Sequence, residues 1–190
     1  MKKPIIILFI VIASVGFAYF LFLQEPGNKT TVEATGFKYV PKAADLLVNL
    51  KKADLEPLST EGTEFHIHQH LDIIINGENI SIPANIGVGG SFISPLHTHD
   101  TTGVLHVESP QKKDFKLSQF FTEWGLTFNN SCIFTYCENI SHKLVVGLNG
   151  NKIDSAPDHI LKPHDQISIW YGLKSEEPIL TKSYNFPAGE

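Results

Sequence analysis

The chain has 190 residues, a formal net charge of −5 and two cysteines. Its hydrophobic content of 42% provides enough apolar material for a core and excludes a globally disordered chain. The sequence has no basic patch, so nucleic acid is not an expected partner. The length suits one domain of ordinary size together with an anchor and tails.

An uncharged apolar segment follows Lys2 and Lys3 and extends from Pro4 to Leu23. Its 20 residues would form about 30 Å of helix, which is enough to cross the hydrocarbon layer of a membrane. A cleaved signal peptide is the alternative, but its apolar region is usually only about 7–15 residues long. We therefore predict a single transmembrane helix over residues 1–23, with a signal peptide as the alternative. In both cases the rest of the chain is expected outside the cytoplasm, at the cell membrane.

Three further parts are expected after this segment. Residues 24–63 are interpreted as a linker with a short amphipathic helix at 43–53, and residues 64–174 as the folded domain. Residues 175–190 are interpreted as a loosely attached tail. Four Asn-x-Ser/Thr sequons agree with an exported glycoprotein, although such triplets also arise by chance: Asn28, Asn79, Asn129 and Asn139.

The folded domain is predicted to begin with a strand over residues 65–75, because apolar and polar side chains alternate there. One face is apolar, and the other carries three histidines and Asp72. Asn76-Gly77 predicts a two-residue hairpin turn into a return strand at residues 80–82. Residues 84–100 are rich in Gly, Ser, Pro and His and are interpreted as a loop.

Later segments complete the predicted fold. We expect a strand at 103–109, a helix at 117–124 that ends at Gly125, and strands at 144–148 and 166–171. Asn149-Gly150 is a second hairpin signal. Two hairpin-like units with a helix between them predict an α+β domain, in which one helix packs on a mixed sheet, somewhat like a β-grasp fold.

Histidines are concentrated in one part of the chain, since six of the nine lie between His66 and His106. Residues two apart on a strand are about 6.6 Å apart and point the same way, so two such imidazoles can bind one ion. The outer pair of a triplet is about 13 Å apart, so the third histidine would serve a second site or support a ligand. The predicted metal ligands are His66, His68, His70, His97, His99 and His106.

Carboxylates close to these histidines have two expected roles. Asp72 or Glu108 would orient a ligating imidazole. If the protein is an enzyme, Glu108 or Asp100 is the expected proton-handling group beside a metal-bound water. Several imidazoles with few carboxylates favour zinc or copper, whereas calcium and magnesium prefer oxygen ligands. The alternative without a metal is a patch of surface histidines that responds to pH.

The two cysteines, Cys132 and Cys137, predict a small disulfide loop in an oxidising compartment. Together with His142 they also resemble the ligand loops of copper electron-transfer sites. Such sites commonly need an axial methionine, and the only methionine here is the initiator. The disulfide is therefore the preferred interpretation.

Three segments together resemble a family of membrane-anchored extracytoplasmic proteins from archaea and some bacteria. They are residues 65–87 with the FHIHQHLD run, residues 95–108 with PLHTHDTTGVLHVE, and residues 117–125 with LSQFFTEWG. The segment with the cysteines is similar to archaeal members, notably those of ammonia oxidisers, whose exported proteins are rich in copper enzymes. The resemblance covers roughly residues 64–173 and implies the anchor and the histidine site, but no activity. By association it favours copper and a membrane copper-enzyme complex as partner.

Three functional hypotheses follow. The first is an outward-facing domain that binds zinc or copper, for metal handling or in support of a membrane complex. The second is a zinc- or copper-dependent metalloenzyme with a histidine-bound water, as in carbonic-anhydrase-like hydration or dismutation. The third is an accessory subunit whose metal only stabilises the fold.

Overall fold

The computed structural model describes residues 39–189, which belong to one compact unit. The predicted transmembrane segment at 1–23 and the sequon at Asn28 lie outside these residues. Within the described range, no helix combines the length and the apolar character needed to cross a bilayer.

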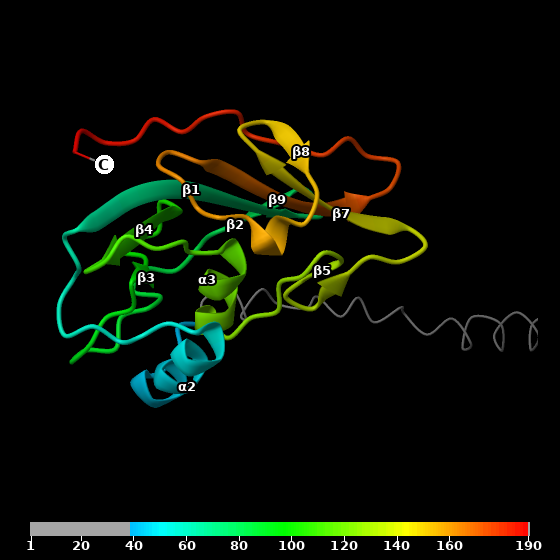
Figure 1. Ribbon diagram of the computed structural model, residues 1–190. Coiled ribbons are helices and arrows are strands. Elements are labelled where there is room, and N and C mark those ends of the chain that lie inside the picture. Colours follow the sequence, from blue (N-terminus) through cyan, green and yellow to red (C-terminus); the bar gives the residue numbers. More distant parts are fainter. Residues whose placement is uncertain (1–38, 190) are drawn as a thin grey trace, which may run out of the picture. The chain divides into compact units, whose positions relative to one another are not determined.

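A mixed sheet forms the centre of the domain (Figure 1). Its strands are β1 Phe65–Ile75, β2 Glu78–Ile80, β3 Leu96–His97, β4 Val104–Ser109, β7 His142–Leu148, β8 Asn151–Ile153 and β9 Gln166–Leu173. The order across the sheet is β3-β4-β1-β9-β7-β8, and β2 pairs with β1. Only β1 and β9 pair in parallel, and the other pairs are antiparallel. The prediction of an α+β domain with a mixed sheet is confirmed.

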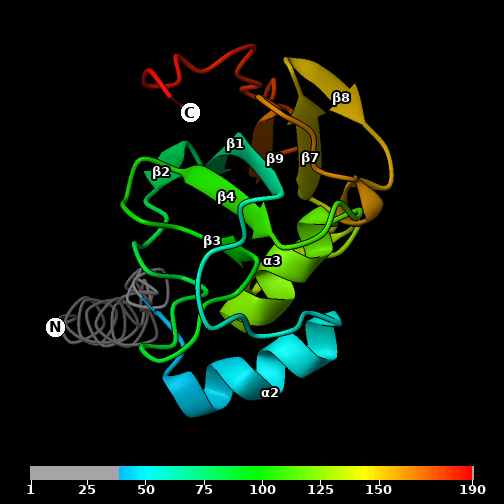
Figure 2. The ribbon, with the colours of Figure 1, turned by 60° about the vertical axis from the view of Figure 1, so that its left-hand side comes forward.

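Two α-helices lie on the same side of this sheet (Figure 2). The first, α2, spans Ala43–Ala53, and the second, α3, spans Leu117–Trp124. Helix α3 lies next to the sheet and α2 packs against α3, because the apolar stripe of α2 with Leu46 and Leu50 must be covered. The sequence predicted only one helix packed on the sheet, so the packing of α2 corrects that prediction. Residues 39–63, expected to be part of a linker, belong to the folded domain.

Both Asn-Gly pairs form hairpin turns. Asn76 and Gly77 have φ values of 52° and 83°, the left-handed conformation that such a turn requires at both positions. The turn places Glu78 directly opposite Ile75, so β2 begins two residues earlier than the predicted return strand. The second pair, at 149–150, joins β7 to β8 with the same signs of φ. A short 3-10 helix, η2 Ala156–Asp158, then precedes β9.

The C-terminal segment lies on the face of the sheet away from the helices (Figure 1). The hydroxyl of Thr181 donates a hydrogen bond to Asp72 at 2.7 Å, and the ring of Tyr184 stacks on His70 with centroids 3.8 Å apart. Leu180 packs on a small apolar cluster that includes Trp170. These contacts hold the middle of the expected tail against the sheet.

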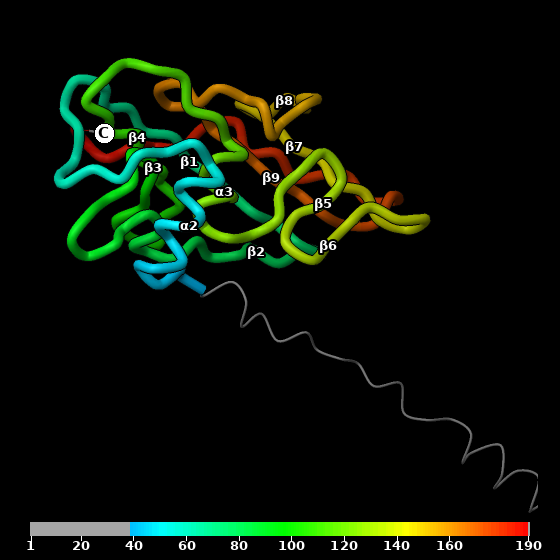
Figure 3. The backbone as a smooth tube through the Cα atoms, turned by 60° about the horizontal axis from the view of Figure 1, so that its bottom comes forward, coloured from blue at the N-terminus to red at the C-terminus, as the bar shows by residue number. Residues whose placement is uncertain are grey.

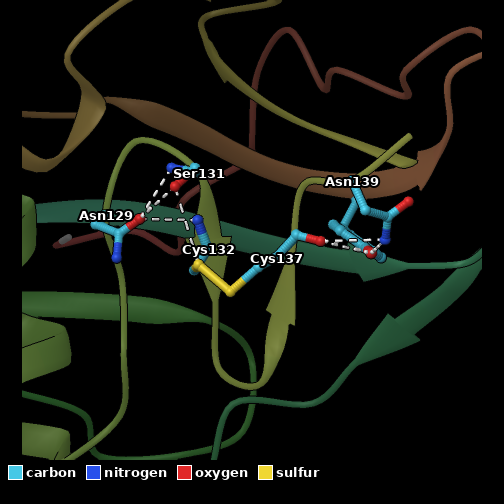
Figure 4. The surroundings of a disulfide bond; sticks show 6 residues. Asn129, Ser131, Cys132, Cys137 and Asn139 are labelled. Atoms are coloured by element: carbon cyan, nitrogen blue, oxygen red, sulfur yellow. Dashed lines mark hydrogen bonds between the residues drawn. A yellow bond between two sulfur atoms is a disulfide. The ribbon is translucent and has the colours of Figure 1, made fainter. Parts of the chain in front are cut away.

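A separate hairpin, β5 Cys132–Ile133 with β6 Tyr136–Cys137, contains the disulfide Cys132–Cys137 (Figure 4). The side-chain oxygen of Asn129 accepts hydrogen bonds from the backbone of Ser131 and Cys132, at 2.9 Å each. Figure 3 shows the hairpin at the opposite end of the domain from β3 and β4. With both sulfurs in the disulfide, a copper electron-transfer site lacks its thiolate ligand.

Candidate metal centre

The candidate centre lies where β1, β4 and β3 run side by side. In the antiparallel β1–β4 pair, His68 is opposite His106 and His66 is opposite Glu108. In the β3–β4 pair, His97 is also opposite His106. Directly paired residues point to the same face of a sheet. Three separate strands therefore present their histidines together, on the face away from α3.

Strand β3 was not predicted, because residues 84–100 were interpreted as a loop. A two-residue strand is too short to produce a recognisable alternation. Its pairing with β4 fixes His97 beside His106. The Nδ1 atom of His97 also donates to the carbonyl of Ser94 at 3.0 Å. Since a carbonyl only accepts, the lone pair of the neutral ring is on Nε2, which faces the cluster.

Two pairs of imidazole nitrogens converge in the cluster. The Nε2 atoms of His66 and His68 are 2.9 Å apart, and those of His97 and His99 are 3.2 Å apart. Two nitrogens bound to the same tetrahedral zinc ion would be about 3.3 Å apart, given Zn–N lengths of about 2.0–2.1 Å. Both pairs are close to the spacing needed for chelation.

The carboxylate of Glu108 lies between the two pairs. Its Oε1 atom is 3.1 Å from Nε2 of His66 and 3.7 Å from Nε2 of His97. The same oxygen is 3.3 Å from Nδ1 of His106. The Glu108 side chain is only 6% exposed, so a cation at this place would neutralise a carboxylate that is largely removed from water.

These residues form two overlapping sets of four, within each of which the potential ligand atoms all lie within 4.8 Å of one another. Both sets include His106 and Glu108. The first adds the β1 pair and the second adds the pair at 97 and 99. The structure thus brings together five of the six predicted histidines with one carboxylate: His66, His68, His97, His99, His106 and Glu108.

Burial determines the protonation of the central imidazoles. It lowers the pKa of His68 and of His97 to about 4, and that of His106 to about 3. Repulsion from the neighbouring imidazoles lowers these pKa values further. The three rings are therefore neutral at pH 7, the form in which histidine binds a metal. Burial also raises the pKa of Glu108.

One side of the cluster is open to solvent. The side chains of His66 and His99 are 47% and 45% exposed, whereas that of His97 is fully buried. Each chelating pair therefore combines one buried and one accessible imidazole. This arrangement leaves a path by which an ion could enter or leave.

Three of the predicted site residues lie outside both sets. Nε2 of His70 donates to the carbonyl of Thr102 at 2.9 Å, and its ring is covered by Tyr184. Asp72 accepts hydrogen bonds from Gln166 and from the C-terminal segment. Asp100 accepts from the backbone and the hydroxyl of Thr102, and these bonds lower its pKa. All three have structural partners instead.

Sequence reasoning missed one carboxylate, Glu61. Its Oε1 atom is 3.6 Å from Nε2 of His99 and 4.0 Å from Nε2 of His97. The residue lies in the segment interpreted as a linker, and its local sequence Ser-Thr-Glu-Gly has no ligand spacing. Only the chain path, which brings this segment beside β4, places Glu61 at the cluster.

Comparisons with family models, with curated proteins and with solved structures gave no match to this chain. The function is therefore argued from the centre itself.

Proposed function

We propose that this protein is a membrane-anchored, extracytoplasmic metal-binding protein that takes up zinc or copper at the histidine cluster. Its role would be metal handling, or that of an accessory subunit in a membrane complex such as a copper enzyme. The observation that carries the proposal is the convergence of five imidazoles and Glu108 from three strands. Imidazole-rich sets of this kind favour zinc and copper over calcium and magnesium.

Exposure of part of the cluster supports metal handling over a purely structural metal. Structural zinc sites are closed, with four protein ligands around the ion. Here His66 and His99 are each nearly half exposed. An accessible ligand on each side allows exchange with a carrier or a partner protein.

The first experiment measures the metal content of the full-length chain, kept in detergent, after loading with zinc, with copper or with both in competition. Bound metal should survive removal of free ions. Loss of a residue that only supports a ligand typically lowers metal affinity by about 10–100-fold. The double variant His97→Ala/His99→Ala removes two ligands and should lower zinc and copper affinity by more than this. The matched control is His142→Ala, which removes a histidine outside the cluster and should bind normally. A wild-type chain that retains neither metal contradicts the proposal.

The location outside the cytoplasm is supported by two features. The Cys132–Cys137 disulfide is typical of an oxidising compartment. Asn79, Asn129 and Asn139 are exposed, as acceptors of a glycan must be. Labelling of intact cells with a membrane-impermeant amine reagent should modify the exposed Lys152. Labelling only after lysis contradicts this location.

The strand order supports the β-grasp-like comparison made from the sequence. The parallel pair β1–β9 is central, with antiparallel partners on both sides and α3 in the connection between the two halves. We propose this relationship at the level of topology alone, and it carries no function.

A metalloenzyme is the second candidate, favoured by the position of Glu108. Its carboxylate oxygen lies within 3.1–3.7 Å of three potential ligand nitrogens, and burial raises its pKa. A carboxylate of this kind can accept a proton beside a metal-bound water. The metal-loaded chain should then hydrate carbon dioxide or dismutate superoxide, and Glu108→Gln should lower the rate per bound metal ion. Inactivity of the loaded wild-type chain in both assays contradicts this candidate.

A further inference from the structure

The cluster contains more ligands than one ion can use. Zinc sites are almost always four-coordinate, and the two overlapping sets offer five imidazoles and one carboxylate. An ion on the β1 pair, His106 and Glu108 would be complete. The nitrogens of His97 and His99, 3.2 Å apart, would then remain as an unused chelating pair.

Glu61 supplies what this remaining pair lacks. Its Oε1 atom is 3.6 Å from Nε2 of His99 and 4.0 Å from Nε2 of His97, and its side chain is 48% exposed. Together with one oxygen of Glu108, Glu61 would complete four ligands around this pair. His106, which both of the closely spaced sets contain, would then serve the first ion alone.

The backbone at Gly62, next to Glu61, packs tightly against the end of β4 and so fixes the position of Glu61. A Cβ atom added at Gly62 would lie 2.2 Å from the carbonyl carbon of Ser109 and 2.4 Å from the nitrogen of Pro110. Both contacts are with backbone at the end of β4, which cannot move aside as a side chain can. The close approach, one residue beyond Glu108, is possible only for glycine. It brings Glu61 to the histidines.

We propose that the centre binds two metal ions that share the carboxylate of Glu108. This inference rests on the proposed metal-binding function and adds the number of ions and the role of Glu61. The ligands of the first ion are His66, His68, His106 and Glu108. The ligands of the second ion are Glu61, His97, His99 and Glu108.

Two carboxylates are available for two cations. Glu61 is near enough to Glu108 to interact with it electrostatically. Each dication would then have one carboxylate of its own or a share in Glu108. Carboxylate-bridged ion pairs of this kind lie about 3.5–4 Å apart in two-metal sites.

The test is the zinc stoichiometry of the full-length chain, combined with the Cu(II) electron paramagnetic resonance spectrum. Two zinc ions per chain are expected in the wild type, and one in Glu61→Gln. Gly62→Ala should also lower the number to one, although it removes no ligand. The matched control Glu64→Gln changes an exposed glutamate of the same loop and should retain two.

The copper spectrum separates a shared centre from two independent ones. Two Cu(II) ions that share Glu108 should give less than the full signal of two spins, because they couple magnetically. Glu61→Gln should restore an ordinary one-spin spectrum. One ion in the wild type and in Glu61→Gln overturns this inference but leaves the proposed function intact. No ion in any form overturns both, and two uncoupled full-intensity spins overturn the shared carboxylate.

Discussion

His68 and His106 face each other across the β1–β4 pair, with ring centroids 4.5 Å apart and ring planes at 83°. Both residues are buried, and their pKa values fall to about 4 and about 3. Two imidazolium ions could not share so small a space away from water. The strand pairing therefore holds two neutral rings side by side, with their lone pairs available to a cation.

Replacement of the two buried histidines of β1, His68 and His70, should affect different properties of the protein. His68→Ala removes a proposed ligand and should weaken zinc binding more than 100-fold. His70→Ala removes the hydrogen bond to Thr102 and the stacking on Tyr184, so it should destabilise the fold by about 1–2 kcal/mol with zinc affinity unchanged. Isothermal titration and urea unfolding measure the two effects. Equal loss of affinity in both variants contradicts the assignment of His70 to a structural role.

Stability of the metal-free chain should depend on pH below neutrality. The pKa values of His68, His97 and His106 are about 4, 4 and 3 in the folded chain, against about 6.5 when unfolded. Between these values the unfolded state binds more protons, so stability is full above pH 6.5 and falls as the pH drops toward 4.

Urea unfolding of the chelator-treated chain from pH 7.5 to 4.5 measures this dependence. His68→Ala should reduce the slope by up to about 1.4 kcal/mol per pH unit, the contribution of one proton. A flat stability profile from pH 7 to pH 5 in the wild type contradicts the burial of neutral imidazoles.

Ser94 lies between helix α3 and the histidine cluster and forms hydrogen bonds to both. Its hydroxyl donates to the buried Glu123 of α3, whose pKa is raised well above the usual range by burial, and its carbonyl accepts from His97. Ser94→Ala leaves Glu123 without this partner and should cost about 1–3 kcal/mol. His97 donates to the backbone carbonyl of residue 94, which the substitution keeps, so zinc affinity should stay within a few-fold of the wild type.

Glu123→Gln is the matched variant for this prediction. The amide is nearly isosteric with the protonated carboxyl group that burial favours, and its oxygen can still accept from Ser94. It should retain zinc affinity within a few-fold. Thermal unfolding and zinc titration of both variants give the comparison. A large loss of zinc affinity in Ser94→Ala but not in Glu123→Gln would contradict the assignment of His97 to the backbone carbonyl alone.

The disulfide should matter for stability but not for the metal. Cys132→Ser/Cys137→Ser removes a short cross-link, which should cost about 2 kcal/mol by the loop-entropy argument. The hairpin lies at the far end of the domain from β3 and β4, so the bound zinc or copper per chain should not change (Figure 3). Loss of copper in this variant would revive the cysteine-ligand interpretation.

Much of the fold could be predicted because the responsible signals are local. The strand at 65–75 follows from alternation, and the helix at 117–124 from its apolar face and the terminal Gly125. The Asn-Gly turns are readable because both positions need positive φ. The two-residue β3 and the packing of α2 on α3 were not predicted, since both depend on partners remote in the sequence.

The sequence by itself determined which residues could bind a metal and which face of the first strand they occupy. The spacing of His66, His68 and His70 also predicts that they cannot all reach one ion. Only the tertiary structure decided which of them meet. Strand pairing places His106 opposite both His68 and His97, while the C-terminal segment covers His70 with Tyr184. Glu61 joins the cluster through the contact of Gly62 with Ser109, which sequence spacing does not encode.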